Sequence, residues 1–330
     1  MPDRVMTTLA VTGITGHSGR FFLKELEEHI FHGTGSTFNS TVGSTISSTI
    51  GTIRCLVRET SNTELLDISP LKNSIEKLVG DYNDYSTLLN LTAGADIVMH
   101  ISNIRQSLNV LKASIENKVA KLVMVHTTGV YSKFKMASGE YKEIESEIEY
   151  ILKETASKND VEVTILRPTM IFGDLCDHNI SKFIRMVDKF PFMPEINRGQ
   201  GKIRPVNARD LAKAYYTVCM SEKRLPELYY DLSGERSLTL HELFDLIGKY
   251  LGKKSVKHIK HISCPMWLGT TGARLLKIMT LGRVDLVEKV LRMGEDRDYN
   301  HDKATRDFGY KPESFNVGLK REVEQYKVIQ

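Results

Sequence analysis

A glycine-rich turn constrains the fold of this chain more than any other feature of its sequence. Residues 8–12 form a short run of β-forming side chains that leads directly into Gly13, Gly16 and Gly19, spaced G-x-x-G-x-x-G. An amphipathic pattern typical of a helix follows over residues 17–29. A strand that enters a glycine-rich turn and leaves as a helix is the sequence context in which this spacing indicates dinucleotide binding.

Each glycine has a separate role in this interpretation. Gly13 permits the tight turn, Gly16 lets the backbone approach a pyrophosphate, and Gly19 lets the helix pack close to the sheet. The helix N-terminus adds N–H donors and the positive end of a dipole. The remaining predicted phosphate-binding residues of this turn are Thr15, His17 and Ser18. The alternative is a plain strand–turn–helix joint without a ligand.

Apolar strands alternate with amphipathic helices along the first half of the chain. The predicted strands are residues 8–12, 53–57, 96–101, 121–126, 161–166 and 229–232, and the predicted helices are 17–29, 108–117, 140–153, 210–220 and 240–251. This alternation predicts an α/β fold, a Rossmann-type doubly wound parallel sheet. We expect this domain over residues 1–173, with a return at about 203–235. Residues 174–202 and 236–330 are expected to form a smaller mixed subdomain on the substrate side.

Composition excludes several classes of protein. The 330 residues carry 45 Lys and Arg against 41 Asp and Glu, so the net charge of +4 does not by itself indicate nucleic-acid binding. No apolar run approaches the roughly 18 residues of a membrane span. The four cysteines have no paired spacing, and the N-terminus has no apolar stretch typical of a secretion signal. We therefore expect a cytoplasmic protein with a small-molecule partner and without nucleic-acid or membrane partners.

Three segments suggest other roles. Residues 33–52 are rich in Ser, Thr and Gly, and we interpret them as an insertion loop rather than a ligand cover. The basic stretch 253–261 lacks interleaved aromatic residues and is expected to be a solvated face. His258, His261 and Cys264 offer metal-ligand types, but on a strand and loop they form a poor zinc site, so no metal is expected.

Several further motifs occur in a fixed order along nearly the whole chain. They are Gly80-Asp81, R-P-T-M-I-F-G at 167–173, R-P-V-N-A-R-D-L-A at 204–212, L-S-G at 232–234 and F-G-Y-K-P at 308–312. With the glycine turn, this order resembles the extended and atypical short-chain dehydrogenases/reductases, a superfamily of NAD(P)-dependent nucleotide-sugar epimerases and dehydratases. The resemblance implies an oxidoreductase, epimerase or dehydratase acting on a nucleotide sugar or related carbonyl compound, as a monomer or homodimer.

The choice of cofactor depends on the end of the second strand. Arg58 stands where NAD-binding proteins usually place an acidic residue, and an arginine there accommodates a 2′-phosphate. We therefore expect NADP(H), with NAD(H) as the alternative if Glu59 occupies that position instead. Arg54 precedes the strand end and is a weaker candidate. By the same resemblance, further cofactor contacts are expected from Asp81, Tyr82 and Pro168.

The resemblance also implies a catalytic tyrosine with a lysine four residues later. Tyr141 occupies the tyrosine position, but Glu145 stands where the family has lysine. A nearby cation lowers the pKa of a phenol from about 10, whereas a carboxylate raises it. Lys135 or Lys142 would have to supply the missing charge. Thr128 is the expected hydroxyl that polarises the reacting oxygen.

Alternatives remain at this site. A literal Y-x-x-x-K match at Tyr131 and Lys135 follows the strand too closely, and Tyr141 could simply line a ligand pocket. Glu145 could be a solvated carboxylate within a run of acids. Asn103, Arg204 and Arg209 are candidates for binding a substrate phosphate. An intact phosphate loop beside an incomplete catalytic set also suits a dinucleotide-binding sensor or assembly protein.

Overall fold

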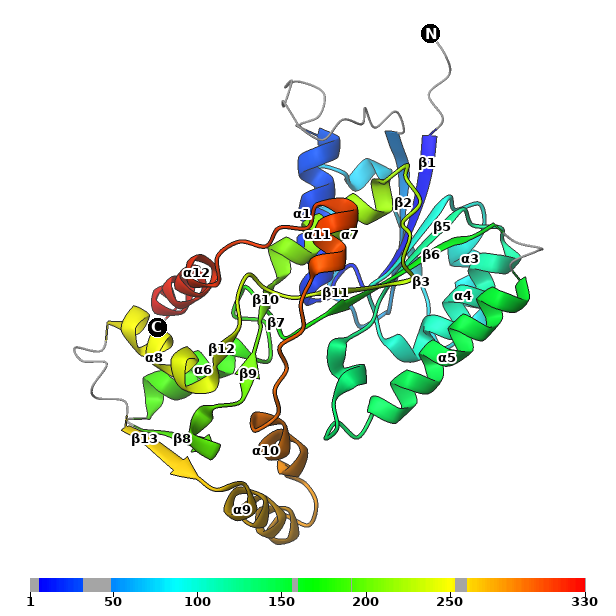
Figure 1. Cartoon of the computed structure of the whole chain (residues 1–330). Helices are drawn as coiled ribbons and strands as arrows, with labels where there is room; N and C mark the ends of the chain where they lie inside the picture. Colours follow the sequence, from blue (N-terminus) through cyan, green and yellow to red (C-terminus); the bar gives the residue numbers. More distant parts are fainter. Residues whose placement is uncertain (1–5, 32–48, 156–159, 191, 253–259, 330) are drawn as a thin grey trace.

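The computed structural model describes residues 6–31, 49–155, 160–190, 192–252 and 260–329. Its centre is a seven-stranded parallel sheet with the strand order β11-β6-β5-β4-β1-β2-β3 (Figure 1). The strands are β1 (Met6–Thr12), β2 (Thr49–Val57), β3 (Ile75–Val79), β4 (Ile97–His100), β5 (Lys121–Val125), β6 (Glu162–Pro168) and β11 (Tyr229–Leu232). This confirms the predicted Rossmann-type α/β fold.

Helices cover both faces of the sheet because its strands are apolar on both sides. Leu9 and Val11 of β1 pack into one core with the first helix and a later one, whereas Ala10 between them faces a second core. The first layer consists of α1 (His17–Phe31) and α7 (Ala208–Met220), together with α2 (Glu64–Asp67) and α11 (Asp302–Phe308) nearby. The second layer consists of α3 (Tyr85–Thr92), α4 (Ser107–Glu116) and α5 (Ser138–Thr155).

A third hydrophobic core lies outside the main sheet and draws its residues from Phe172 onward. Its short strands pair as β7 (Ile171–Phe172) with β10 (Val206–Asn207), β9 (Lys202–Ile203) with β12 (Leu238–Thr239), and β8 (Phe192–Ile196) with β13 (Lys260–Cys264). The helices that supply its buried residues are α6 (Ile180–Lys189), α8 (Leu240–Leu251) and α12 (Phe315–Val328). The outer part of the chain also contains α9 (Met266–Met279) and α10 (Val287–Met293). The proposed domain boundary at residue 173 stays a prediction.

The structure corrects two expectations about secondary structure. Thr49–Thr52 are not part of an insertion loop, because they begin β2 and pair with Met6–Thr8 of β1. Arg167 and Pro168 do not follow the sixth strand but end it, paired with Asp231 and Leu232. The rest of the Ser/Thr/Gly-rich segment and His258 lie outside the described residues. No helix in the described ranges is long and apolar enough to cross a membrane.

Candidate active site

The glycine turn after β1 has the geometry expected of a phosphate cradle. Gly13 has a φ of +76°, and a Cβ there would lie 2.8 Å from the backbone nitrogen of Ser102. A Cβ on Gly19 would lie 2.1 Å from the carbonyl oxygen of Gly13. Both positions therefore exclude any side chain, which leaves the backbone N–H groups at the start of α1 open to an anionic ligand.

A cleft of about 280 Å³ opens above this turn, lined by Gly13, Thr15, Gly16, His17 and Ser18 at one end. Its other end contains Arg58, Ser61 and Tyr82, and the Arg58 guanidinium carbon lies 5.8 Å from the Tyr82 ring centroid. An arginine stacked on an aromatic ring beside a hydroxyl suits the adenosine end of a dinucleotide. The structure therefore brings the glycine turn, Arg58 and Tyr82 together.

Three neighbouring charged residues do not line this cleft. Arg54 pairs with Glu76, Nε to Oε2 at 3.1 Å, and donates to the carbonyl oxygens of Leu91 and Ala93. Glu59 is exposed, and Asp81 accepts hydrogen bonds from the backbone and side chain of Asn83 in a turn. Arg58 is thus the arginine at the end of β2 that is available to a ligand.

A larger cleft of about 570 Å³ continues from the first and shares Thr15, His17 and Ile171 with it. Its walls come from the ends of β5 and β6 and from the outer core. The side chains that carry charge or hydroxyl groups there include Arg20, Thr127, Thr128, Lys135, Thr169, Asp177, Arg204, Arg292 and Arg297. The two clefts form one continuous trough at the carboxyl ends of the sheet strands, where open α/β sheets bind their ligands.

Tyr141 is buried beside this trough rather than among its lining residues. It lies in the first turns of α5, and its side chain is 8% exposed. The Lys135 Nζ lies 4.7 Å from its ring centroid, and the Arg105 guanidinium carbon lies 5.7 Å away. Two cations therefore flank the phenol. Lys142, the other lysine considered, is exposed and lies about 100° round the helix from Tyr141.

Lys135 stands between this tyrosine and the larger cleft, which it lines. Burial lowers its pKa, and the positive charges of Arg292 and Arg105 add to that effect while Glu288 opposes it. A lysine amine with a lowered pKa in a cleft is suited to proton transfer as well as to charge stabilisation.

Two adjacent threonines, Thr127 and Thr128, lie after β5 at the start of a short 3₁₀ turn. The Thr128 hydroxyl donates to the carbonyl oxygen of Pro168 at 3.3 Å, and its side chain is buried. The Thr127 hydroxyl oxygen accepts a hydrogen bond from the backbone nitrogen of Gly129 at 3.0 Å. Thr127 therefore keeps its proton for a ligand in the cleft, whereas Thr128 gives its proton to the protein.

Glu145 is not a solvated carboxylate, which corrects one of the alternatives. It is 4% exposed and takes a bidentate contact from Arg167, Nε to Oε1 at 2.9 Å and Nη2 to Oε2 at 2.5 Å. His126 Nδ1 lies 3.0 Å from the same Oε1. Burial acts to raise the pKa of Glu145, but these two partners hold it below its usual value. The family lysine is therefore replaced by the anion of a buried ion cluster.

Tyr131 and Lys135 line different clefts. The Tyr131 hydroxyl lies 3.1 Å from Oδ2 of Asp231 and accepts from Arg167 Nη1 at 2.7 Å, at the end of β6 away from the larger cleft. Burial and the Asp231 carboxylate raise its pKa to about 12. A phenol in this environment is a poor acid at neutral pH.

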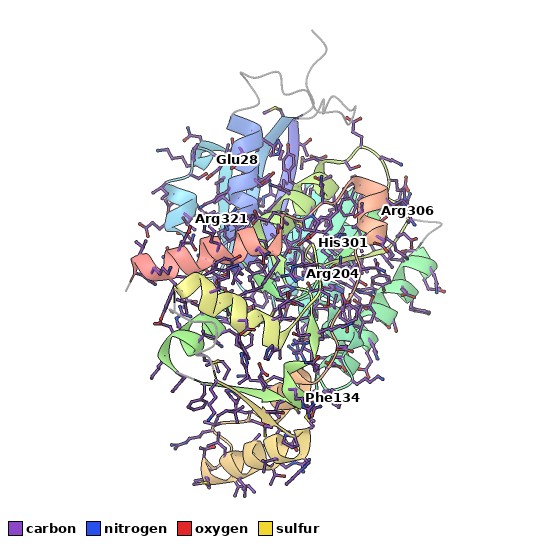
Figure 2. The ribbon with its side chains drawn as sticks, turned by 60° about the vertical axis from the view of Figure 1, so that its left-hand side comes forward. Glu28, Phe134, Arg204, His301, Arg306 and Arg321 are labelled. Atoms are coloured by element: carbon purple, nitrogen blue, oxygen red, sulfur yellow. The ribbon has the colours of Figure 1, made fainter. Side chains whose placement is uncertain are left out.

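Arginines gather on the far wall of the larger cleft. Arg204 lies near the middle of the molecule and donates to the carbonyl oxygens of Gly234 and Glu235 (Figure 2). The Nε atoms of Arg292 and Arg297 are buried without a hydrogen-bond partner. Burial, together with Arg292, lowers the pKa of Arg297 to about 10. Arg292 still pairs with Glu288 and Glu295, at 3.8 and 3.9 Å. The buried Nε of Arg297, which has no hydrogen-bond partner, favours an anionic ligand in the cleft.

The other candidates for binding a substrate phosphate lie elsewhere. Asn103 caps a turn by accepting from the backbone nitrogen of Arg105. Arg209 donates to the carbonyl oxygen of Gly173 and stacks on Phe21, 4.8 Å from its ring centroid. Of the three, the structure brings Arg204 alone to the cleft.

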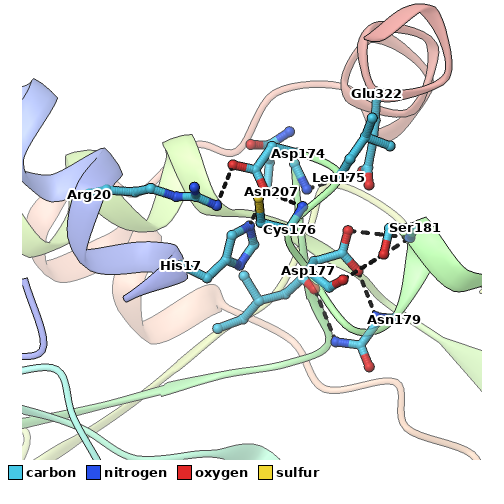
Figure 3. A network of polar contacts seen from close by, with 12 residues as sticks. His17, Arg20, Asp174, Leu175, Cys176, Asp177, Asn179, Ser181, Asn207 and Glu322 are labelled. Atoms are coloured by element: carbon cyan, nitrogen blue, oxygen red, sulfur yellow. Dashed lines mark hydrogen bonds and ion pairs between the residues drawn. The ribbon is translucent and has the colours of Figure 1, made fainter. Parts of the chain in front are cut away.

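A polar network ties the glycine turn to the outer core (Figure 3). His17 Nε2 lies 2.9 Å from Oδ1 of Asp174, and Arg20 Nη2 lies 2.6 Å from its Oδ2. Asp174 follows β7, so the first turn of α1 is fastened to the segment that begins the outer part of the chain. Nearby, Glu322 of α12 accepts from the backbone nitrogen of Gly173.

Sequence reasoning missed Arg20, Thr127, Arg292 and Arg297 as cleft residues. Arg20 directly follows Gly19 and Thr127 precedes the chosen threonine, so both had a signal in their position. Arg292 and Arg297 lie far along the chain from the glycine turn, and no local pattern marks them. Only the packing of α10 and the segment after it brings them to the cleft.

The comparisons with known proteins agree on the fold. The profile of the NAD dependent epimerase/dehydratase family matches residues 9–229. No curated protein sequence matches the chain. Three similar solved structures are a dTDP-glucose 4,6-dehydratase from Streptomyces venezuelae with NAD bound, and two 4-epimerases, one for UDP-N-acetylglucosamine from Methanobrevibacter ruminantium and one for UDP-glucose from Thermotoga maritima.

The likeness extends over whole chains at low identity. The dehydratase has a TM-score of 0.67 and 18% identity, covering 98% of this chain and 97% of its own. The two epimerases each have a TM-score of 0.66, with 16% and 17% identity, covering 99% and 98% of this chain and 100% of their own. The family profile spans most of the chain and includes the glycine turn, so this protein belongs to the NAD-dependent epimerase/dehydratase family.

Proposed function

We propose that this protein is an NADP(H)-dependent epimerase, dehydratase or reductase that acts on a nucleotide sugar or a related carbonyl compound. The observation that carries this proposal is the continuous trough from the glycine turn, past Thr127 and Lys135, to Arg204 and Arg297. The trough thus combines a dinucleotide cradle, a reaction centre and a wall that binds anions.

The residues present fit a nicotinamide dinucleotide. Gly13 and Gly19 leave the cradle open for the pyrophosphate, and His17 lines its rim. Arg58, with Ser61 beside it, would hold a 2′-phosphate, which favours NADP(H) over NAD(H). When bound, the nicotinamide supplies hydride transfer to or from the substrate.

The arginine wall would hold the phosphates of a nucleotide sugar. Arg204 and Arg297 line the larger cleft and not the cofactor cradle, and arginine binds phosphate oxygens through paired N–H groups. Binding energy from those phosphates would place the sugar carbon beside the threonines. This use of remote binding energy orients the reacting group.

Proton transfer at the reacting oxygen would fall to Tyr141 and Lys135. Lys135 supplies the positive charge that the family takes from the lysine replaced by Glu145, and it stands between the phenol and the cleft. Thr127 would donate its hydroxyl proton to the reacting oxygen, and we assign that role to it rather than to Thr128. These three groups would act as acid, charge stabiliser and orienting donor.

A dinucleotide-binding sensor or assembly protein is the second candidate. The observation that favours it is the buried cluster of Glu145, Arg167 and His126. In this cluster, the residue at the position of the family lysine contacts other side chains of the protein rather than a ligand. In this case the cradle would bind NADP(H) without turnover.

The first experiment is calorimetric titration of cofactor-stripped protein with NADPH and then NADH. We expect NADPH to bind at least about tenfold more tightly, because each charge-assisted contact to the 2′-phosphate contributes more than about 1.4 kcal/mol. Arg58→Ala is expected to remove this preference, and Arg54→Ala, which alters an arginine outside the cleft, should keep it. Equal binding of the two cofactors by the unmodified protein would refute the assignment of Arg58.

The second experiment separates the enzyme from the sensor. Sugar nucleotides that carry deuterium at the oxidised sugar carbon are incubated with the protein and NADP+, and keto-sugar nucleotides are incubated with the protein and NADPH labelled with deuterium at C4. Transfer of label between sugar and cofactor is followed by mass spectrometry. Transfer that falls by a factor of about 100 or more in Tyr141→Phe or Lys135→Met supports the enzyme. Tight NADPH binding without transfer to any sugar nucleotide supports the sensor.

A further inference from the structure

Two imidazoles and two carboxylates converge in the outer part of the chain, away from the trough. Glu195 lies in β8, His241 and Asp245 lie one turn apart in α8, and His261 lies in β13. None of these four residues lines either part of the cleft. We propose that Glu195, His241 and His261 bind a zinc ion, with Asp245 orienting the two histidines.

The donor atoms of the three residues converge closely enough to share one ion. Nδ1 of His241 lies 3.0 Å from Oε1 of Glu195, and Nδ1 of His261 lies 2.5 Å from the same oxygen. One ligand atom from each of the three residues lies within 4.8 Å of the others. Ligands about 2.0–2.2 Å from a tetrahedral zinc ion are about 3.3 Å from one another, so small outward shifts admit the metal.

Asp245 faces the opposite nitrogens of the two rings. Nε2 of His261 lies 3.0 Å from its Oδ1, and Nε2 of His241 lies 3.7 Å from its Oδ2. A carboxylate behind a metal-bound histidine is the usual way in which a protein fixes the proton on one ring nitrogen and turns the other toward the ion. Here it presents both Nδ1 lone pairs to Glu195.

This arrangement calls for positive charge between the rings and Glu195. A lone pair that faces a carboxylate oxygen is repelled unless a proton or a cation lies between them. The two rings are tilted by 36° with centroids 3.9 Å apart, so protons on every ring nitrogen would bring two like charges into contact. The Glu195 side chain is 2% exposed, which weakens solvent screening. One divalent ion satisfies all three donors at once.

The fold, and not local sequence, builds the site. His241 and Asp245 are four residues apart and so share one face of α8. β13 runs parallel to β8 with Ser263 opposite Glu195, which places His261, two residues earlier, on the same face of the strand. Cys264 does not join them, since its thiol lies 3.5 Å from the carbonyl oxygen of Pro265.

The donor set selects the metal. Two imidazole nitrogens and one carboxylate suit zinc, whereas calcium and magnesium prefer oxygen ligands alone. An ion here would fasten β13 to β8 and α8. Because β13 leads into α9 and α10, the same ion would steady the segment that brings Arg292 and Arg297 to the cleft. The zinc site itself is independent of the proposed function.

The test uses the full chain, stripped with a chelator, dialysed and titrated with zinc chloride by calorimetry. We expect one ion per chain with a dissociation constant below about 1 μM, and a weakening of at least about 100-fold in His261→Ala. Asp245→Asn should weaken binding by about 10–100-fold. His29→Ala is the matched control, because His29 also pairs with a carboxylate, Glu25, but lies on α1.

Cobalt binding by the unmodified protein keeps the proposal testable if a variant fails to fold. Intense visible absorption bands of tetrahedral Co²⁺, lost on adding zinc, are the expected result. Absence of these bands, no zinc uptake, or uptake unchanged in His261→Ala would overturn the proposal. Any of these results would make the cluster a hydrogen-bonded ion network held together by protons.

Discussion

At the scale of single residues, Glu145 is the position at which this chain departs from the lysine of the family pattern. Restoring the family lysine by Glu145→Lys would place a second cation against Arg167 in a buried site and remove the carboxylate that pairs with Arg167 and His126. Removing one partner of a buried ion pair costs about 3–5 kcal/mol, so we expect the free energy of unfolding to fall by at least that amount. Denaturant unfolding measures this change.

The matched control for Glu145→Lys is Glu143→Lys, which makes the same change on the exposed face of α5. Its free energy of unfolding should change by less than about 0.5 kcal/mol. Equal stability of Glu145→Lys and the unmodified protein, or a gain in turnover on restoring the lysine, would show that the ion cluster is not what holds this position.

At the scale of secondary-structure elements, the joint between β1 and α1 depends on Gly19. A methyl group at this position would lie 2.1 Å from the Gly13 carbonyl oxygen, so Gly19→Ala must push α1 away from the turn. We expect NADPH affinity to fall at least about tenfold and stability by about 1–3 kcal/mol, the usual cost of overpacking. Calorimetry and denaturant unfolding measure the two effects.

Gly139→Ala serves as the control for this element. Gly139 lies in α5, and a Cβ there meets no atom within 4 Å. Alanine favours a helix over glycine by about 1 kcal/mol, so this variant should be as stable as the unmodified protein or more so. A comparable loss of NADPH binding in both variants would contradict the packing argument.

At the scale of the whole molecule, the C-terminal helix α12 introduces a pH dependence. Burial, followed by the neighbouring Asp177, raises the pKa of Glu322 to about 10 (Figure 3). A carboxyl group with a raised pKa is protonated in the folded state. In the unfolded chain the same group loses its proton above the ordinary pKa of glutamate, so at higher pH folding takes up a proton. The free energy of unfolding therefore decreases as the pH rises from about 5 toward 9.

Glu322→Gln tests this dependence because glutamine mimics the protonated acid. We expect the variant to match the unmodified protein near pH 5 and to be more stable by about 1–3 kcal/mol near pH 8.5. Urea unfolding at several pH values measures the difference. Parallel pH profiles for the two proteins would mean that Glu322 does not titrate as described.

The trough also predicts that the cofactor and the nucleotide sugar bind to different parts of the cleft. Arg58 lines the cleft above the glycine turn and Arg297 lines the larger cleft, and these two parts share Thr15 and His17. Thermal stabilisation by NADPH should fall in Arg58→Ala and persist in Arg297→Ala, and stabilisation by UDP-glucose should show the reverse. Loss of both responses in either variant would indicate a single shared site.

The sequence alone determined the glycine turn, its helix and the central sheet except for β3 (Ile75–Val79), which was not among the predicted strands. These features are local: period-two apolar strands, amphipathic helices and glycines at fixed spacing each follow from a few neighbouring residues. The position of Arg58 at the end of the second strand also follows from the sequence, and the departure at Glu145 follows from the resemblance to the family. Sequence reasoning extended the insertion to residue 52 because Gly51 and Thr52 have turn-forming character, whereas pairing with β1 makes them a strand.

Only the tertiary structure decided which polar groups meet. Glu145 meets Arg167 and His126 across α5, β6 and the end of β5, and Arg297 reaches a cleft whose cradle begins at Gly13. Likewise, His261 meets His241 through the pairing of β13 with β8 rather than through its neighbours in sequence. The physical reason is that charge and hydrogen-bond partners are selected by proximity in space, and proximity between distant segments follows from how the whole chain packs.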